Sequence, residues 1–287
     1  MPEGDTVHRL AERMAGLTGR LITSSDFRVP HLATASLTGR RIERVWAWGK
    51  NLYWDCTDSD GSTWVLHTHL RMEGIWNIHP AGTTWRSPGH TARVVVRVEG
   101  SPDPAREVEL VGHELGKVKL WNATSYPEHT GHLGPDPLDE DWDEPGRWKI
   151  PGRDEAVRRF LAEGNRALGK TLLDQRVLAG VGNVYCNELC FLQGRHPSSP
   201  ASSVDAARIM DLAAQSMRAN RHANLRVFTG VNRPGENTWV YGRKNRACRR
   251  CGAPICSGFL GGATTVADPR AGQERITYWC PTCQPLG

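Results

Sequence analysis

Four cysteines near the C-terminus have the spacing of metal ligands. Cys248-Arg-Arg-Cys251 and Cys280-Pro-Thr-Cys283 are two C-x-x-C pairs with 28 residues between them. Each pair can offer two thiolates from adjacent turns, and four thiolates form a closed zinc site with no open position. Disulfides or idle thiols are the alternative, and the separation between the two pairs exceeds that of common zinc fingers. Metal binding is favoured, because the chain has no secretory features that would indicate disulfides. We therefore predict one structural Zn²⁺.

A run of positive charge leads into and through the first cysteine pair. Its members, with no acidic residue among them, are Arg243, Lys244, Arg246, Arg249 and Arg250. Such a run is usually a solvated face. Attached to a rigid zinc loop, it becomes a surface suited to contacting phosphates.

The segment from Gly164 to Thr171, which contains Lys170, matches the P-loop pattern G-x-x-x-x-G-K-[ST]. A P-loop follows a buried β-strand, whereas residues 154–163 carry five charges at helical spacing. ATP or GTP binding is therefore disfavoured, and Lys170 is available to another anion.

A second glycine pattern, Gly180-Val-Gly-Asn183, lies between two helical stretches. Two glycines let the chain turn tightly, so that backbone N–H groups and the Asn183 amide can point at a phosphate. An ordinary helix-turn-helix corner is the alternative.

Histidines and the N-terminus offer two further possibilities. His67 and His69 would share one face of a strand, and His79 and His90 could complete a metal site, but no carboxylate partner lies nearby in the sequence, so scattered polar histidines are favoured. If Met1 is removed, Pro2 presents a secondary amine beside Glu3, and such an amine can attack a sugar carbon and form an iminium. An inert N-terminus is the alternative.

The elements that must position these residues follow from periodicity. Residues 3–14 have one apolar face at helical spacing, with Asp5 or Thr6 as candidate caps. Short β-rich runs separated by Gly, Pro and Asp turns fill residues 20–122 and predict an antiparallel sandwich or barrel. Helical spacing returns after residue 152, and we expect the last 45 or so residues to need a metal or a covalent staple to fold.

Composition limits the class of protein. The 287 residues have a mean hydropathy of −0.49 and show neither an apolar membrane-spanning run nor a secretory leader, so we expect a cytoplasmic protein. Residues 1–150 hold 17 basic and 21 acidic residues, whereas residues 151–287 hold 19 and 10. The basic second half suggests an anionic partner.

Together the motifs resemble the Fpg/Nei family of DNA glycosylases, with details similar to its endonuclease VIII (Nei) branch of actinobacterial type. The similarity spans nearly the whole chain, in the family's order. The motifs are Pro2-Glu3-Gly4, Gly49-Lys50, His69-Leu-Arg-Met72-Glu-Gly74, Gly180-Val-Gly-Asn183-Val-Tyr185-Cys-Asn-Glu188 and Tyr241-Gly-Arg-Lys244 before the cysteine pairs.

The resemblance implies a multidomain α+β fold with DNA bound between its parts. We expect an N-terminal helix plus antiparallel β-sandwich as the catalytic domain over residues 1–135, a linker over 136–152, a helix-two-turn-helix DNA-binding domain over 153–240 and a zinc finger over 241–287.

The resemblance also assigns catalytic roles. Pro2 corresponds to the Schiff-base nucleophile that attacks C1′ of the damaged nucleotide, and Glu3 to the proton donor. Lys50 corresponds to a lysine that contacts phosphate and assists β-elimination. Arg275 corresponds to the finger arginine that grips the phosphates at the lesion and is linked to δ-elimination.

The expected DNA contacts come from both halves of the chain. Met72 resembles the wedge that fills the gap left by an everted nucleotide. His113-Glu-Leu-Gly116 departs from the family, because it replaces the Arg-x-Phe loop of the formamidopyrimidine branch. Met72 must then fill the gap alone or with Arg71 and Glu73. The other expected DNA-binding residues are His69, Arg71, Lys170, Asn183, Arg243 and Lys244.

We therefore predict a bifunctional DNA glycosylase and AP lyase of base excision repair that removes oxidised bases, pyrimidines favoured, by β,δ-elimination. An oxidised-purine glycosylase is the nearest alternative, and a non-catalytic zinc protein that binds DNA damage is the alternative from another class. We expect a monomer in the bacterial cytosol whose partner is damaged DNA, with no membrane and no nucleotide cofactor.

Overall fold

The computed structural model describes residues 2–103, 105–260 and 275–286, and it divides into two units, residues 1–132 and 133–287. Each unit has its own core. No helix in the described residues has the length and apolarity needed to cross a membrane.

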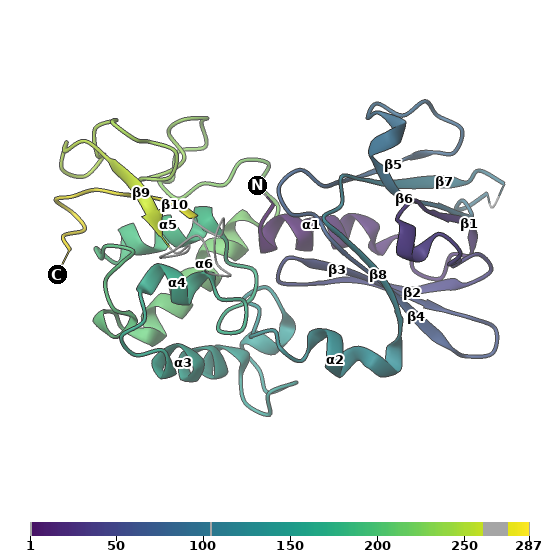
Figure 1. Cartoon of the computed structure of the whole chain (residues 1–287), viewed down its shortest axis with the longest axis horizontal. Coiled ribbons are helices and arrows are strands. Elements are labelled where there is room, and N and C mark those ends of the chain that lie inside the picture. Colours follow the sequence, from purple (N-terminus) through teal and green to yellow (C-terminus); the bar gives the residue numbers. More distant parts are fainter. Residues whose placement is uncertain (1, 104, 261–274, 287) are drawn as a thin grey trace. The chain divides into compact units, whose positions relative to one another are not determined.

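The first unit is a sandwich of two antiparallel four-stranded sheets (Figure 1). One sheet has the order β1 (Ile22–Phe27), β6 (Ala92–Val98), β7 (Val108–His113) and β5 (Ile75–Pro80). The other has the order β2 (Arg41–Trp48), β3 (Asn51–Thr57), β4 (Thr63–His69) and β8 (Lys117–Asn122). Short helices join or follow the strands: η1 (Pro30–Leu32), η2 (Gly89–Thr91), η3 (Ala123–Ser125) and α2 (Tyr126–Thr130).

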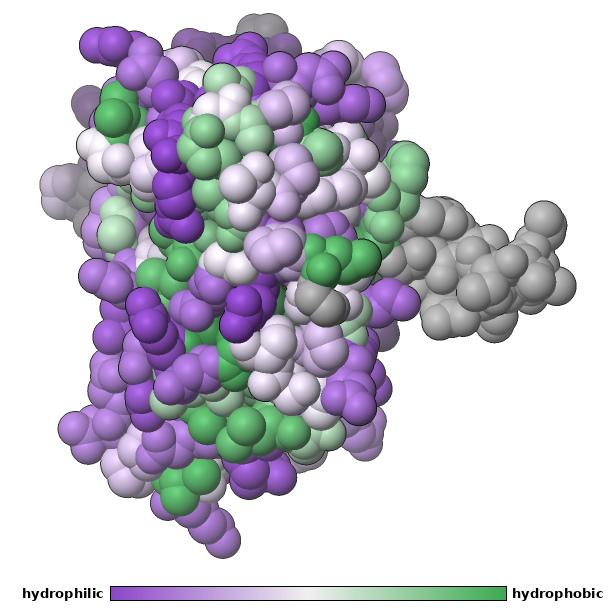
Figure 2. Space-filling model, turned by 90° about the vertical axis from the view of Figure 1, so that its left-hand side faces the viewer, coloured by the Kyte–Doolittle hydropathy of each residue, from purple (hydrophilic) through white to green (hydrophobic). Residues whose placement is uncertain are grey.

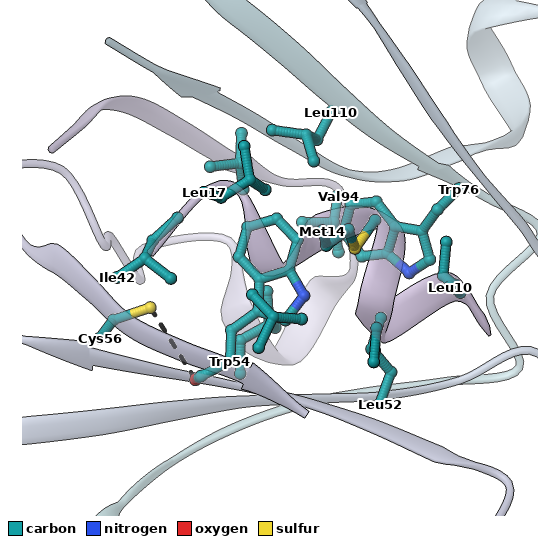
Figure 3. Packing of buried hydrophobic residues seen from close by; sticks show 14 of the residues in the cluster. Leu10, Met14, Leu17, Ile42, Leu52, Trp54, Cys56, Trp76, Val94 and Leu110 are labelled. Atoms are coloured by element: carbon teal, nitrogen blue, oxygen red, sulfur yellow. Dashed lines mark hydrogen bonds between the residues drawn. The ribbon is translucent and has the colours of Figure 1, made fainter. Parts of the chain in front are cut away.

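Helix α1 (Gly4–Ala15) contributes its apolar face to the core between the sheets. Figure 3 shows Leu10 and Met14 of α1 among side chains from both sheets, including Trp54 of β3 and Trp76 of β5, whose rings stack at 5.3 Å. This packing explains why residues 3–14 have one apolar face at helical spacing. The predicted caps were wrong: Glu3 occupies the N-cap position, and Asp5 and Thr6 lie within the helix.

The second unit is helical, with a two-stranded hairpin near its end. Its elements are η4 (Glu140–Trp142), α3 (Gly152–Ala162), α4 (Leu168–Leu173), α5 (Asn183–Leu192), η5 (Ala201–Ser203), α6 (Ala206–Asn220), β9 (Cys256–Leu260) and β10 (Arg275–Trp279). On the face seen in Figure 2, apolar residues form scattered patches among hydrophilic ones.

Residues 136–152, expected to be a linker, instead belong to the second unit. Leu138 and Trp142 are buried in its main core with Phe160 of α3 and Met210 of α6. The Pro- and Asp-rich composition of this segment therefore marks turns in a packed chain.

Candidate functional site

Pro2 and Glu3 lie at the start of α1. Pro2 is half-buried, and the Glu3 side chain is fully buried in the first unit. The Glu3 carbonyl accepts the N–H groups of Thr6 and Val7, which begins the helix. The positive end of a helix disfavours a protonated amine nearby, so this position suits a nucleophilic N-terminal nitrogen once Met1 is removed.

Lys50 lies at the tip of the β2–β3 hairpin. Trp48 pairs with Asn51, so Gly49 and Lys50 are the two central residues of the turn. Gly49 has φ of 59°, which suits the glycine of a type II′ turn. The half-buried Lys50 is thus held on a short, fixed turn.

The loop after β4 presents Met72. Its side chain is 64% exposed, which is unusual for a large apolar residue and suits a wedge. A Cβ on Gly74 would lie 2.4 Å from the Leu70 carbonyl oxygen, so this turn requires glycine. Arg71, at the apex, has φ of 53°, and its N–H donates to Nδ1 of His69 at 2.9 Å.

His69 is held in its neutral form. Burial, followed by the charges of Lys117, Lys50 and Arg71, lowers the pKa of His69 to about 4. Since Nδ1 accepts the Arg71 N–H, the ring proton is on Nε2, which can donate to a phosphate oxygen.

The β7–β8 turn does not offer a second wedge. Leu115 is buried in the sandwich core, and Gly116 lies against Arg71: a Cβ there would fall 2.3 Å from the Arg71 side chain. Two large apolar residues of this region are exposed, Met72 at 64% and Ile75 of β5 at 45%, and Met72 is the more exposed.

In the second unit, Lys170 is half-buried on α4, and Asn183 is the first residue of α5 after the turn that contains Gly180, whose φ is 93°. The Asn183 amide donates one N–H to the Ile276 carbonyl of β10 at 2.8 Å.

Asn187 also holds β10. Its side-chain oxygen accepts from the Thr277 hydroxyl and from the Tyr278 N–H at 2.6 Å. These bonds fix the strand that begins with the exposed Arg275 beside α5.

Glu188 is a positioning residue whose role the sequence did not reveal, although it ends the glycine-turn motif. Its buried carboxylate accepts the backbone N–H groups of Trp239, Val240 and Tyr241 at 2.7, 3.0 and 2.8 Å. Burial raises the pKa of Glu188, but both oxygens accept N–H bonds, which is the arrangement of the ionised form. Glu188 thereby fastens the segment before the basic run to α5.

The basic run is divided by the structure. Arg243 is buried, and its guanidinium donates to the carbonyls of Trp239 and Ala247, which is a structural role; its DNA contact stays a prediction. Arg249 donates to the carbonyls of Thr238 and Gly235. Lys244 is exposed and remains available to an anionic partner.

The four cysteines of the two pairs form one cluster whose sulfur atoms all lie within 4.8 Å of one another. The Sγ atoms of Cys251 and Cys280 are 3.3 Å apart, too far for a disulfide. Backbone N–H groups of Arg250 and Cys283 point at the sulfurs of Cys248 and Cys280, both at 3.4 Å. The donor set is compatible with a tetrahedral zinc ion.

Two alternatives fail on local structure. The residues before Gly164 form helix α3, so the strand that a P-loop requires is replaced by a helix. Gly169 has a packing role, because a Cβ there would meet the Leu260 side chain at 2.3 Å. Among the described residues, the cysteines form the sole metal-competent cluster, and His67 and His69 have no partners for a metal site.

Family models match both units. The formamidopyrimidine-DNA glycosylase N-terminal domain matches residues 1–114, and the H2TH domain of the same glycosylase matches residues 133–223. Among curated proteins, "Probable endonuclease 8 2" of Streptomyces coelicolor is 42% identical over 99% of this chain and 94% of its own. "DNA-(apurinic or apyrimidinic site) lyase Nei2" of Mycolicibacterium smegmatis is 38% identical over 99% of both chains.

Solved structures confirm the fold. MutM in complex with DNA containing carbocyclic 8-oxo-G has a TM-score of 0.74 at 20% identity, covering 99% of this chain and 100% of that one. Lactococcus lactis Fpg in complex with abasic-site DNA has a TM-score of 0.72 at 20% identity over the same shares. The chain therefore belongs to the family of formamidopyrimidine-DNA glycosylases and endonucleases 8, the bifunctional glycosylases and AP lyases of base excision repair.

Proposed function

We propose that this chain removes oxidised bases from DNA, with pyrimidines preferred, and uses Pro2 as its nucleophile. The observation that carries the proposal is the Pro2-Glu3 start of α1, in a chain 42% identical to a relative named endonuclease 8. A buried carboxyl group beside a potential N-terminal amine is a suitable proton donor for a sugar.

The covalent steps use the N-terminal residues, the DNA and water. The nitrogen lone pair of Pro2 attacks C1′, the glycosidic bond breaks, and the base departs with its bonding electrons and takes up the proton that the Pro2 nitrogen loses. Glu3 protonates the ring oxygen as the sugar opens, which leaves an iminium between Pro2 and C1′. The iminium acidifies the C2′ proton, and loss of that proton to water expels the 3′ phosphate. Loss of the C4′ proton then expels the 5′ phosphate, and water hydrolyses the iminium to free Pro2.

The DNA-binding residues act on the phosphates and on the gap. In this proposal Lys50 and Arg275 bind the phosphates at the lesion, His69, Lys170, Asn183 and Lys244 bind neighbouring ones, and Met72 fills the gap beside Arg71. Two fold relatives are known in complexes with DNA that contains 8-oxo-G or an abasic site, which supports damaged DNA as the partner here.

Zn²⁺ is proposed as the ion that the cysteine cluster binds. Four thiolates whose sulfur atoms lie within 4.8 Å of one another repel, so a cation is needed to keep them ionised and together. The ion would hold the β9–β10 hairpin, and with it Arg275, in place.

Strand cutting on defined lesions tests this proposal. Duplexes carry one abasic site, one oxidised pyrimidine or one 8-oxoguanine, and Glu3→Gln is the matched variant. We expect cutting at the abasic site and at the oxidised pyrimidine, with phosphate at both ends of the gap, and loss of base removal in Glu3→Gln. Cutting at 8-oxoguanine alone would favour the oxidised-purine enzyme, and binding without cutting would contradict catalysis.

A further inference from the structure

A pocket of about 310 Å³ in the first unit is lined by basic side chains. Its ten lining residues include no acid and five basic residues, namely Arg28, His31, Arg93, Lys117 and Lys119. They come from the loop after β1, the start of β6, and the β7–β8 turn with the strand that follows it. None of them has a role in the mechanism above.

The pocket lies between the loop that follows one edge strand and the start of another. β1 ends one sheet and β8 ends the other. Nε2 of His31 lies 2.9 Å from the Val118 carbonyl oxygen, which ties the loop after β1 to β8. Arg28 donates to Asp26 at 2.7 Å and lies over the Trp85 ring at 5.2 Å. The His31 and Arg28 side chains are therefore held in place on their side of the pocket.

The positive charge of the pocket is only partly compensated. Arg28 pairs with Asp26, and Arg93 lies 3.7 Å from Glu114. Within the part of the chain that the structure describes, Lys117 and Lys119 form no ion pair. Burial and the charges of Lys119 and Arg71 lower the pKa of Lys117, as expected where cations gather without an anion.

The pocket adjoins the loop that carries Met72. Gly116 lines the pocket, its N–H donates to the His69 carbonyl at 2.9 Å, and the Arg71 side chain lies across it. His69 and Lys117 are also directly paired across β4 and β8. The basic Arg71 side chain therefore lies beside the pocket, and the neutral His69 is next to its Lys117.

We propose that this pocket binds a backbone phosphate of the DNA, beyond the phosphates held at the lesion. A phosphate diester carries one negative charge and accepts hydrogen bonds from Lys and Arg, so it matches the uncompensated lysines. The inference rests on the proposed function for its partner, DNA. It extends the contact surface of the first unit to the edge strand β8.

Lys119→Gln tests the proposal, because this exposed side chain can lose its charge without loss of packing. The assay measures the Kd for a duplex with a tetrahydrofuran abasic analogue, by fluorescence anisotropy at several salt concentrations. Loss of one phosphate contact should weaken binding about fivefold and reduce the slope of log K against log salt by about 0.9. Arg106→Gln is the matched control, since Arg106 is exposed at the other end of β7 and should change Kd less than about twofold.

Neutral phosphates locate the contact. A set of duplexes, each with one methylphosphonate, should contain a position whose neutralisation weakens the wild type but not Lys119→Gln. No coupled position, or an unchanged salt slope in Lys119→Gln, would overturn the pocket proposal. Borohydride trapping separates the two proposals. If the wild type forms an adduct with abasic DNA and Lys119→Gln binds DNA as tightly as the wild type, only the pocket proposal is refuted. If the wild type neither binds DNA nor forms an adduct, the proposed function is refuted.

Discussion

Glu188→Gln should loosen the segment that leads into the cysteine cluster. The carboxylate Oε1 accepts from Val240 and Tyr241, and Oε2 accepts from Trp239. A glutamine has the same shape but only one acceptor oxygen. Its NH₂ group would face at least one backbone N–H, so two donors would oppose each other in a buried site.

The magnitude follows from these three bonds. One N–H left without an acceptor costs about 1–3 kcal/mol, and each of the other two changes from a charge-assisted to a neutral bond, a loss of about 1 kcal/mol. Relief from burying a charge offsets part of this loss. We expect a net cost of about 3 kcal/mol for the local structure, which corresponds to about a 100-fold larger open population.

Hydrogen exchange measures this effect directly, because two units need not unfold in one step. The amide protons of residues 239–241 should exchange about 100-fold faster in Glu188→Gln. Glu163→Gln is the control, since this carboxylate is partly exposed and pairs with Arg166 on the surface of the same unit. Exchange less than about fivefold faster in Glu188→Gln would refute the positioning role.

Three further perturbations have definite expected outcomes. Gly116→Ala should weaken DNA binding with little loss of stability, because its Cβ displaces the Arg71 side chain; unchanged Kd in anisotropy would contradict this. Burial lowers the pKa of His67 to about 3, so below pH 6.5 the folded state binds fewer protons than the unfolded state. The free energy of unfolding should therefore fall by about 2 kcal/mol between neutral pH and pH 5. Denaturant titrations of His67→Gln should not show this pH dependence. Chelation of the proposed Zn²⁺ should abolish DNA binding, and atomic absorption spectrometry should detect one Zn²⁺ released per chain. The near-UV circular dichroism of the first unit should persist, because this unit has its own core.

Local patterns in the sequence predicted the elements that carry the site. The apolar spacing of Leu10 and Met14 indicated α1, and the β-rich runs indicated the strands of the sandwich. The two C-x-x-C pairs predicted a four-cysteine cluster, because the spacing within each pair suits two ligands of one metal ion. The helix and the strands depend on residues close together in the sequence, and the cysteine cluster depends on one motif.

Features that depend on tertiary packing were not predictable. Arg243 looked like its basic neighbours, and only the fold shows that its guanidinium is used by backbone carbonyls. Trp142 lay among acidic residues that suggested a linker, although its indole is buried in a core. The pocket combines Arg28 with Lys119, and no periodicity links residues so far apart in sequence.

The central claim is that Pro2 forms a covalent iminium with DNA. Borohydride reduction on an oligonucleotide with one abasic site tests it, with wild type compared with Pro2→Gly and with an N-terminally blocked form. We predict a stable protein–DNA adduct for the wild type that is lost when the N-terminus is blocked. An adduct that survives blocking, or no adduct although DNA binds, would contradict the assignment of Pro2.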